Sequence, residues 1–338
     1  MITPIPQPSS SNSSALRDQF GRSIEYLRIS VTDRCNFRCV YCMPEQGMQW
    51  LPKTDILSYN EIAEVVRQLA PLGLRRLRIT GGEPTIRPQI HELIRMLRDV
   101  PAIEDIALST NGVRLPEIGG LLRESGLDRV NMSVDSLRDE RIVKIARRSL
   151  GLDPVRSAQA AEDAGLTPIK LNVVVMRGVN DDEVEDLARL TIDHPWHVRF
   201  IELMPVGDLR SLTWEHVVPS AEIIERLNAI APLEPSSGPA KGNGPAAYYA
   251  WPNARGTIGV ITPMTHTYCA SCNRVRLTAD GRLRTCLFGN HEVDLRTALR
   301  AGEPLEPLFR DALANKPKEH ELLQMKVGGL KALSQVGG

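Results

Sequence analysis

The sequence predicts an α/β protein in which an incomplete (β/α)6 TIM-like barrel is followed by a smaller C-terminal domain. Three observations lead to this prediction: strand and helix patterns alternate six times over residues 25–204, the alternation then stops, and the chain has 338 residues. A chain of this length exceeds a typical single domain. Repeated strand–helix units indicate a parallel sheet with helices packed outside it.

The pattern divides the chain into three parts. The first 14 residues are rich in Ser and Pro, so we expect a disordered N-terminal lead-in over residues 1–20. We expect the partial barrel over residues 21–205 and the C-terminal domain over residues 206–338.

The six barrel strands are expected near residues 25–31, 74–80, 104–109, 128–134, 168–175 and 197–203. Most of them alternate apolar and polar side chains, whereas a parallel strand buried on both faces would be almost continuously apolar. In the second strand, Leu77 and Ile79 share one face, and Arg76, Arg78 and Thr80 share the other. If helices cover the apolar faces, the polar faces line a lumen that can hold a buried ligand.

Two points stay open in this interpretation. The sixth strand places Arg199 on the same face as Ile201 and Leu203, so its lumen face is ambiguous. An exposed antiparallel sheet would also show alternation along its strands, although the long helical connections argue against it.

The strand–helix rhythm stops after residue 204. We expect, in order, a helix near 220–229, a Pro/Gly/Ser-rich loop over 232–246, strands near 247–251 and 256–261, a hairpin over 275–284, and helical segments over 294–325. Asp280-Gly281 would form the turn of that hairpin, because Asp-Gly favours two-residue hairpin turns.

The loop after the first strand contains half of the six cysteines, Cys35, Cys39 and Cys42. Thiolates bind soft metals, and structural zinc normally takes four protein ligands. Three cysteines at this spacing therefore indicate a site with one open metal position, such as a [4Fe-4S] cluster with one iron free of protein. The alternative is one stripe of a helix, since the spacing is also i, i+4, i+7 and buried cysteine is a common small hydrophobe.

The other three cysteines are Cys269, Cys272 and Cys286. A Cys-x2-Cys pair is typical of zinc sites, with His266 or His291 as the nearest fourth ligand. A second three-cysteine cluster would instead leave no cysteine unassigned. Six cysteines in a chain without an export signal favour metal ligation over disulfides, and we expect a cytoplasmic protein.

Charge and hydropathy exclude two classes of partner. Lys+Arg and Asp+Glu balance at 41 each, so nothing supports nucleic-acid binding, which usually shows a basic excess. No apolar run approaches the roughly 18 residues of a membrane-spanning helix. Cations instead recur on the predicted strands. Arg28, Arg78 and Lys170 lie on predicted lumen faces, Arg199 lies on the ambiguous sixth strand, and Arg274 and Arg276 share one face of a later strand. Together they indicate a pocket for a small polyanion.

Cys-x3-Cys-x2-Cys with Tyr41 before the third cysteine resembles the signature of the radical S-adenosylmethionine (SAM) superfamily. From about residue 20 to its end, the chain resembles the GTP 3′,8-cyclase family of molybdenum cofactor biosynthesis. The resemblance implies two [4Fe-4S] clusters, SAM and GTP. The implied SAM contacts are Tyr41, Gly82, Ser133 and Met204. The implied GTP contacts are Arg28, Arg78, Ser109, Lys170, Arg199, Arg274, Val275 and Arg276.

The same resemblance implies the reaction. A 5′-deoxyadenosyl radical abstracts hydrogen from C3′ of the GTP ribose, and the C3′ radical adds to guanine C8. Reduction of this radical adduct by one electron, with uptake of a proton, gives (8S)-3′,8-cyclo-7,8-dihydroguanosine 5′-triphosphate. No side-chain acid or base stands out, as expected where cofactors carry the chemistry. A terminal Gly337-Gly338 tail would enter the active site. Ser109 stands where the family often has Thr.

The implied partners are a flavodoxin-like electron donor, a second copy of the chain in a homodimer, and cyclic pyranopterin monophosphate synthase as the next enzyme of the pathway. Two other functions stay open: a peptide-modifying radical SAM enzyme with an auxiliary cluster, and a non-catalytic zinc-binding scaffold. The Arg274 and Arg276 pair inside the second cysteine set favours a nucleotide substrate.

Overall fold

The computed structural model describes residues 16–204, 212–239 and 244–320. All the strands of these residues join one sheet, in the order β12-β11-β10-β1-β2-β3-β4-β5-β6-β9-β8-β7. The barrel strands are β1 Tyr26–Ser30, β2 Arg76–Thr80, β3 Asp105–Thr110, β4 Arg129–Ser133, β5 Lys170–Val175 and β6 His197–Glu202. The later strands are β7 Glu234–Ser236, β8 Ala247–Ala250, β9 Thr257–Ile261, β10 Arg274–Leu277, β11 Arg282–Arg284 and β12 Glu292–Asp294.

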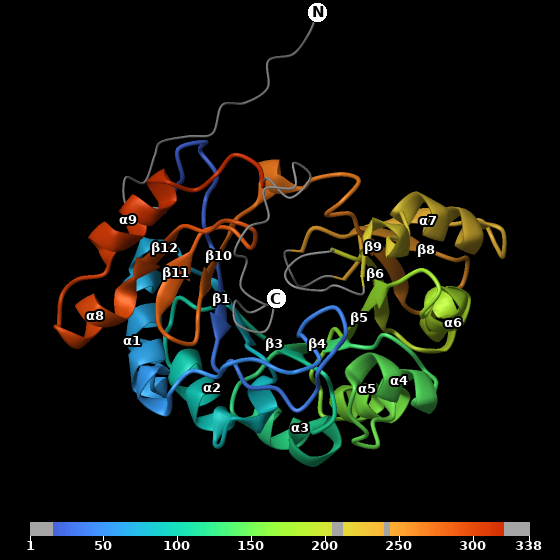
Figure 1. The fold of residues 1–338 in the computed structure, drawn as a ribbon, viewed down its shortest axis with the longest axis horizontal. Helices are drawn as coiled ribbons and strands as arrows, with labels where there is room; N and C mark the ends of the chain where they lie inside the picture. The colour runs from blue at the N-terminus through green and yellow to red at the C-terminus, as the bar shows by residue number, and fades with distance from the viewer. Residues whose placement is uncertain (1–15, 205–211, 240–243, 321–338) are drawn as a thin grey trace, which may run out of the picture.

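Helices cover the outer side of this curved sheet, which Figure 1 shows as an open arch. They are α1 Tyr59–Leu69, α2 Ile90–Arg98, α3 Leu115–Glu124, α4 Asp139–Ala146, α5 Pro154–Asp163, α6 Val184–Asp193, α7 Ser220–Asn228, α8 Leu295–Arg300 and α9 Glu306–Ala314. None of these described helices combines the length and the apolar character that crossing a lipid bilayer requires.

The strands β1 to β6 pair in parallel, which confirms the partial barrel and makes the antiparallel alternative wrong. On β2 the alternation has the expected cause, because Arg78 lines a cavity while the apolar side chains pack into the core. Leu77 and Ile79 are fully buried in the apolar core. Arg199 and Ile201 on β6, and Leu203 just after it, all line one cavity, so the ambiguous strand presents its Arg199 face to the lumen.

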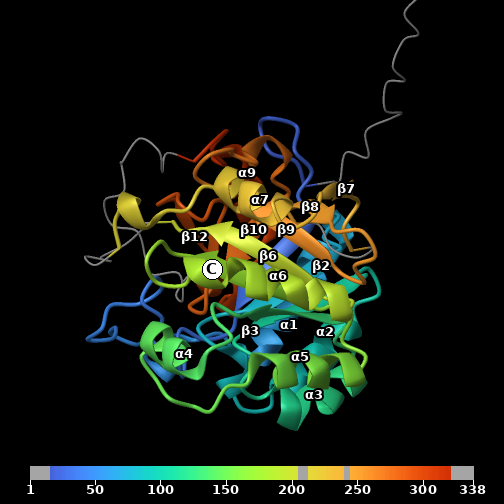
Figure 2. The ribbon, with the colours of Figure 1, turned by 90° about the vertical axis from the view of Figure 1, so that its right-hand side faces the viewer.

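The C-terminal part of the chain extends both edges of the barrel sheet. β10 pairs in parallel with β1 (Figure 1). β9 pairs in parallel with β6, and the two strands lie side by side in Figure 2. The hairpin of β10 and β11 is present at Asp280-Gly281. The boundary predicted between residues 205 and 206 falls within 205–211, which lie outside the described residues. The division into two domains therefore stays a prediction.

The structure corrects two details of the sequence interpretation. The loop expected over 232–246 contains β7, which pairs with β8; Glu-Pro-Ser shows no strand pattern, and the pairing with a distant segment decides its conformation. Residues 1–15 of the expected lead-in lie outside the described residues, but Leu16 is buried and its N–H donates to Leu72 O at 2.9 Å. Residues 16–20 therefore include packed positions, which the expected lead-in does not allow for.

Candidate active site

The first three cysteines lie in the loop that follows β1, and residues 35–42 form no helix. The helix-stripe alternative is therefore wrong. The loop is tied to the end of α4, because Arg38 N–H donates to Ala146 O at 2.8 Å and Val40 N–H donates to Ile145 O at 3.0 Å. These bonds bring Cys35, Cys39 and Cys42 to the wall of one cavity, the first cavity.

The surroundings of these thiols suit metal ligands. Burial, with a smaller effect of the Glu83 carboxylate, raises the pKa of Cys35 to about 12. Burial also raises the pKa of Cys39 well above its usual value. A thiolate at either position therefore needs the compensating charge of a metal at neutral pH.

Gly82 packs the end of β2 against the cysteine loop. A Cβ at this position would lie 2.2 Å from Arg34 O, so no larger residue fits. Gly82 N–H donates to Thr32 O at 2.8 Å, and Glu83 N–H donates to Arg34 O at 2.9 Å. The Gly-Gly-Glu segment thereby forms one side of the first cavity.

The Glu83 carboxylate, which the sequence interpretation passed over, joins the loops after β2 and β3. It accepts hydrogen bonds from Thr85 N–H at 3.0 Å, Thr85 Oγ1 at 2.6 Å, Thr110 Oγ1 at 2.7 Å and Asn111 N–H at 2.7 Å. Burial raises its pKa, against the opposing effect of these donors. The sequence could have pointed to Glu83, because it is an acidic residue between Gly-Gly and Pro directly after a predicted strand.

Replacing Glu83 with alanine should lower the free energy of unfolding by roughly 2–4 kcal/mol, because it leaves several buried donors unsatisfied. Urea denaturation of the anaerobically prepared protein measures this. The matched control is Glu117→Ala, which removes an exposed carboxylate of α3 that pairs with Arg114 at the surface and should change stability by no more than about 0.5 kcal/mol. Equal effects of the two variants would contradict the role given to Glu83.

Asp135 connects the cysteine loop to the ends of β4 and β5. Tyr41 Oη donates to Asp135 Oδ2 at 2.7 Å, and Val174 N–H donates to Asp135 Oδ1 at 2.9 Å. Burial raises the pKa of Asp135 to about 6. Tyr41, Ser109, Ser133 and Asp135 line both the first cavity and a second one, so the two cavities adjoin at these residues.

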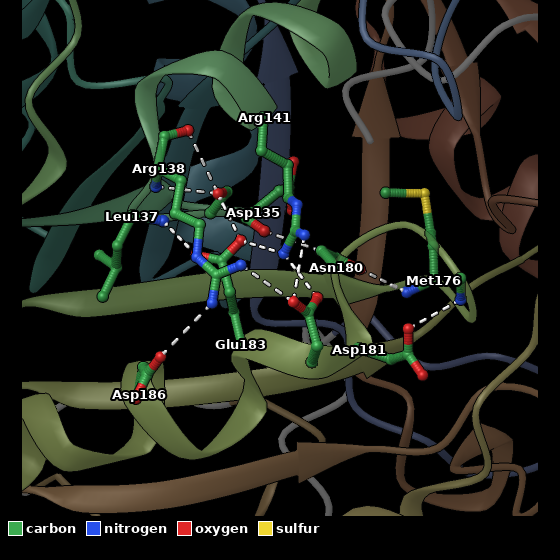
Figure 3. A network of polar contacts seen from close by, with 12 residues as sticks. Asp135, Leu137, Arg138, Arg141, Met176, Asn180, Asp181, Glu183 and Asp186 are labelled. Atoms are coloured by element: carbon green, nitrogen blue, oxygen red, sulfur yellow. Dashed lines mark hydrogen bonds and ion pairs between the residues drawn. The ribbon is translucent and has the colours of Figure 1, made fainter.

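A polar network supports the Asp135 loop from outside the cavities (Figure 3). Asn180 Nδ2 donates to Asp135 O at 2.7 Å, and the buried Glu183 carboxylate accepts from Ser136 Oγ at 2.7 Å and Leu137 N–H at 2.8 Å. Arg141 on α4 pairs with Glu183. The loops after β4 and β5 are therefore fixed to one another.

The second cavity is lined by arginines from several strands of the sheet. In the sheet register, Arg28 on β1 lies between Arg78 on β2 and Arg276 on β10, and all three guanidiniums line the cavity together with Arg199 and Arg274. Burial lowers the pKa of Arg78 and of Arg276 to about 10. Arg28 is shifted well below its usual pKa by burial and by its two arginine neighbours.

Several buried donors around this cavity lack a partner among the described residues: Arg78 Nε, Arg129 Nη1, Asn131 Nδ2 and Arg199 Nε. Buried polar groups are normally satisfied. Clustered guanidiniums with unsatisfied N–H groups fit a polyanion with many acceptor oxygens, such as a triphosphate.

Lys170 lies deeper in the lumen and is not among the residues that line the cavity. It is 3% exposed and precedes by two residues Asn172, which does line the cavity. Burial, then Arg129, Arg199 and Arg78, lower its pKa to about 6. Arg129 is held by a bidentate ion pair with Asp105, at 2.8 and 2.6 Å.

The second cysteine set borders the second cavity. Tyr268 and Leu287, which neighbour Cys269 and Cys286, line that cavity with Arg274. Burial raises the pKa of Cys269, and Cys286 and Cys272 add to this. Within the described residues, no three His, Cys, Asp or Glu side chains converge on a single ion. A cubane cluster binds its cysteines through separate irons, so its ligands need not converge in this way.

The structure thus brings most predicted site residues together. Of the expected SAM contacts, Tyr41, Gly82 and Ser133 line the first cavity, and Met204 lines only the second. Of the expected GTP contacts, Lys170 and Val275 do not line the second cavity, and Val275 is buried in the apolar core. Gly337-Gly338 lies outside the described residues. Lining residues that we missed include Tyr26, Asn172, Glu202 and Tyr268.

Family comparisons cover both parts of the chain. Residues 29–191 match the Radical SAM superfamily, and residues 196–322 match the family described as Molybdenum Cofactor Synthesis C. The structure of SuiB from Streptococcus suis bound to S-adenosylmethionine superposes with a TM-score of 0.60 at 14% identity, covering 92% of this chain and 74% of SuiB. At that identity the likeness shows the fold alone, which is the partial radical SAM barrel.

Two curated relatives are much closer in sequence. A GTP 3′,8-cyclase from Pelotomaculum thermopropionicum is 47% identical over 327 residues, covering 96% of this chain and 100% of the relative. A GTP 3′,8-cyclase from Moorella thermoacetica is 46% identical over 328 residues, with 96% and 100% coverage. With both cysteine sets and both cavities present, and with this identity over nearly its whole length, the chain belongs to the GTP 3′,8-cyclase family of radical SAM proteins.

Proposed function

We propose that the protein converts GTP to (8S)-3′,8-cyclo-7,8-dihydroguanosine 5′-triphosphate, the first step of molybdopterin precursor synthesis. The observation that carries the proposal is the in-register row of Arg78, Arg28 and Arg276 in a cavity that adjoins the first cysteine site and borders the second. The enzyme is a SAM-dependent lyase with two [4Fe-4S] clusters.

The first cluster is held by Cys35, Cys39 and Cys42. SAM would be held by Tyr41, Gly82, Ser133 and Met204, of which Tyr41 and Ser133 line both cavities. When bound, the cluster and SAM supply the 5′-deoxyadenosyl radical that removes the C3′ hydrogen of GTP before C3′ bonds to guanine C8. The protein contributes binding, orientation and electrostatics: the Tyr41–Asp135 hydrogen bond fixes the loop that presents the cluster, and the Glu83 contacts fix the glycine segment opposite.

GTP occupies the second cavity. Its roughly four negative charges are met by Arg28, Arg78, Arg199, Arg274 and Arg276, since charged hydrogen bonds of this kind contribute about 1.5–3 kcal/mol each. Ser109 lines both cavities and contacts the nucleotide where they adjoin. Lys170, which is buried behind the cavity lining, adds positive charge. Val275 lies on the opposite face of β10, so its contact is through the main chain. Cys269, Cys272 and Cys286 would hold the second cluster beside this cavity, which their neighbours Tyr268 and Leu287 line.

Lys170 should make GTP binding pH-dependent. With a pKa of about 6 in the ligand-free protein, the amine is mostly neutral at pH 7.5, and a bound triphosphate favours the ammonium and raises this pKa. GTP binding should therefore take up as much as one proton, and affinity should fall as pH rises above about 6.

Calorimetry of GTP binding in buffers of different ionisation enthalpy measures this uptake. Lys170→Arg is the control, because its guanidinium stays charged and the GTP phosphates titrate identically in both proteins. The wild type should take up more protons than the variant at pH 7.5. Equal proton uptake by the two proteins would refute this role of Lys170.

Substrate-dependent SAM cleavage tests the proposed function. Under anaerobic reducing conditions, GTP should stimulate the release of 5′-deoxyadenosine, and peptides should not. Stimulation by a peptide instead would favour a peptide-modifying radical SAM enzyme. Stoichiometric zinc in place of iron and sulfide would favour a non-catalytic scaffold.

We further propose a cytoplasmic location, reduction by a flavodoxin-like electron donor, a homodimer, and delivery of the product to cyclic pyranopterin monophosphate synthase. These proposals rest on the family resemblance. The chemistry requires a low-potential electron, which a donor must supply. Its product is an intermediate of a longer synthesis, so another enzyme must consume it.

A further inference from the structure

Lys316 is a buried lysine beside the second cysteine set, and the proposed function gives it no role. It follows α9 and is 2% exposed. Its ammonium donates to Cys272 Sγ at 3.6 Å, to Arg274 O at 3.1 Å and to Thr285 O. Lysine has three N–H donors, and these three acceptors satisfy all of them.

The acceptors belong to the segments that present the second set of cysteines. Arg274 is two residues after Cys272, and Thr285 directly precedes Cys286. In the described part of the chain, no carboxylate forms an ion pair with Lys316; its neighbours are a ligand sulfur and two carbonyl groups. A buried ammonium without a carboxylate requires another negative partner, and the thiolates of the second set provide one.

The position of Lys316 is fixed by the N-terminal segment. Gln19 Nε2 donates to Lys316 O at 3.2 Å. Arg22 Nη2 donates to Pro317 O at 2.7 Å, and Arg22 Nη1 donates to Cys269 O at 2.7 Å. Arg22 is itself paired with the buried Asp18 at 2.5 Å. One arginine therefore holds both the segment that carries Lys316 and the loop that carries Cys269.

We propose that Lys316 is a positioning residue for the second cluster, and that its charged hydrogen bond to Cys272 Sγ favours the reduced state of that cluster. This inference rests on the proposed function, in which Cys269, Cys272 and Cys286 hold a [4Fe-4S] cluster. Net charge and hydrogen bonds to the ligand sulfurs set the reduction potential of such clusters. One added electron makes the cluster more negative, which strengthens its interaction with the ammonium; no proton is transferred.

Potentiometric titration of the holoenzyme, followed by electron paramagnetic resonance, tests the proposal. The signal that Cys272→Ala removes belongs to the second cluster. In Lys316→Met, the ratio of reduced to oxidised second cluster at a fixed potential should fall about tenfold, which is about 59 mV for a one-electron couple. The first cluster should be unchanged. Lys316→Arg, which keeps the charge and the donors, should restore most of the ratio.

The matched control is Lys318→Met, the same change at an exposed lysine two residues away, which should leave both potentials unchanged. Loss of the second cluster from Lys316→Met with rescue by Lys316→Arg would support the positioning role. An unchanged ratio in Lys316→Met, or equal loss in both Lys316 variants, would overturn it. Wild-type protein with only about four irons per chain would instead refute the proposed function, so the two failures are distinguishable.

Discussion

Replacing Cys39 with alanine is expected to abolish GTP-dependent SAM cleavage and to lower the iron content from about eight to about four atoms per chain. Cys39 is the middle cysteine of the first set, and its carbonyl accepts from Cys42 N–H at 2.9 Å and Met43 N–H at 3.0 Å. Alanine keeps this turn but removes a thiolate that binds the first cluster. Apart from Cys35 and Cys42, which are already ligands, no described cysteine lines the first cavity and could replace it.

Cys272→Ala is the matched control for this experiment. It should also lose about half of the iron, but it keeps the cluster that cleaves SAM, so slow GTP-independent release of 5′-deoxyadenosine under strong reductant should persist. Iron and sulfide analysis and chromatography of the nucleosides measure both effects. Wild-type iron and activity in Cys39→Ala would contradict the assignment of the first cluster.

The second large effect is expected for Arg276→Ala, which should weaken GTP binding by about 10- to 100-fold. Arg276 is buried, lines the second cavity and pairs in register with Arg28. Losing a hydrogen bond between charged partners costs about 1.5–3 kcal/mol, which corresponds to this change in the dissociation constant. Anaerobic calorimetry with GTP measures it.

Arg282→Ala is the matched control for Arg276→Ala. Arg282 lies on the adjoining strand β11, but its half-exposed side chain pairs with Asp280 and Glu292 and lines neither cavity. GTP affinity in this variant should stay near that of the wild type, because exposed charges contribute little. Equal affinities of Arg276→Ala and wild-type protein would show that the triphosphate does not bind at the arginine row.

Local patterns predicted the barrel and the sites within it. Alternation along most of the barrel strands identified the lumen face, because side chains of a strand point to opposite sides, whereas the lumen face of the sixth strand stayed ambiguous. The same reasoning could have placed Arg129 on the lumen face, since it precedes Asn131 by two residues on the same face of β4. The spacing of Cys35, Cys39 and Cys42 indicated a metal site, and only the structure could place them in a loop instead of a helix.

Features that depend on distant pairing could not be predicted in the same way. The parallel addition of β10 to β1 and of β9 to β6 is decided by the closure of the sheet, and no local signal specifies it. Lys316 lies in a short polar segment after α9, and its sequence neighbours give no hint of Cys272. The depth of Lys170 below the cavity follows from the strand register, which the sequence alone leaves undetermined.

The reaction of GTP carrying deuterium at C3′ tests the central claim most directly. With SAM, reductant and the anaerobic enzyme, mass spectrometry should find the deuterium in 5′-deoxyadenosine. The nucleotide product should be an isomer of GTP that has lost this deuterium and gained a hydrogen. Deuterium that stays in the nucleotide, or 5′-deoxyadenosine formed equally well without GTP, would contradict the account.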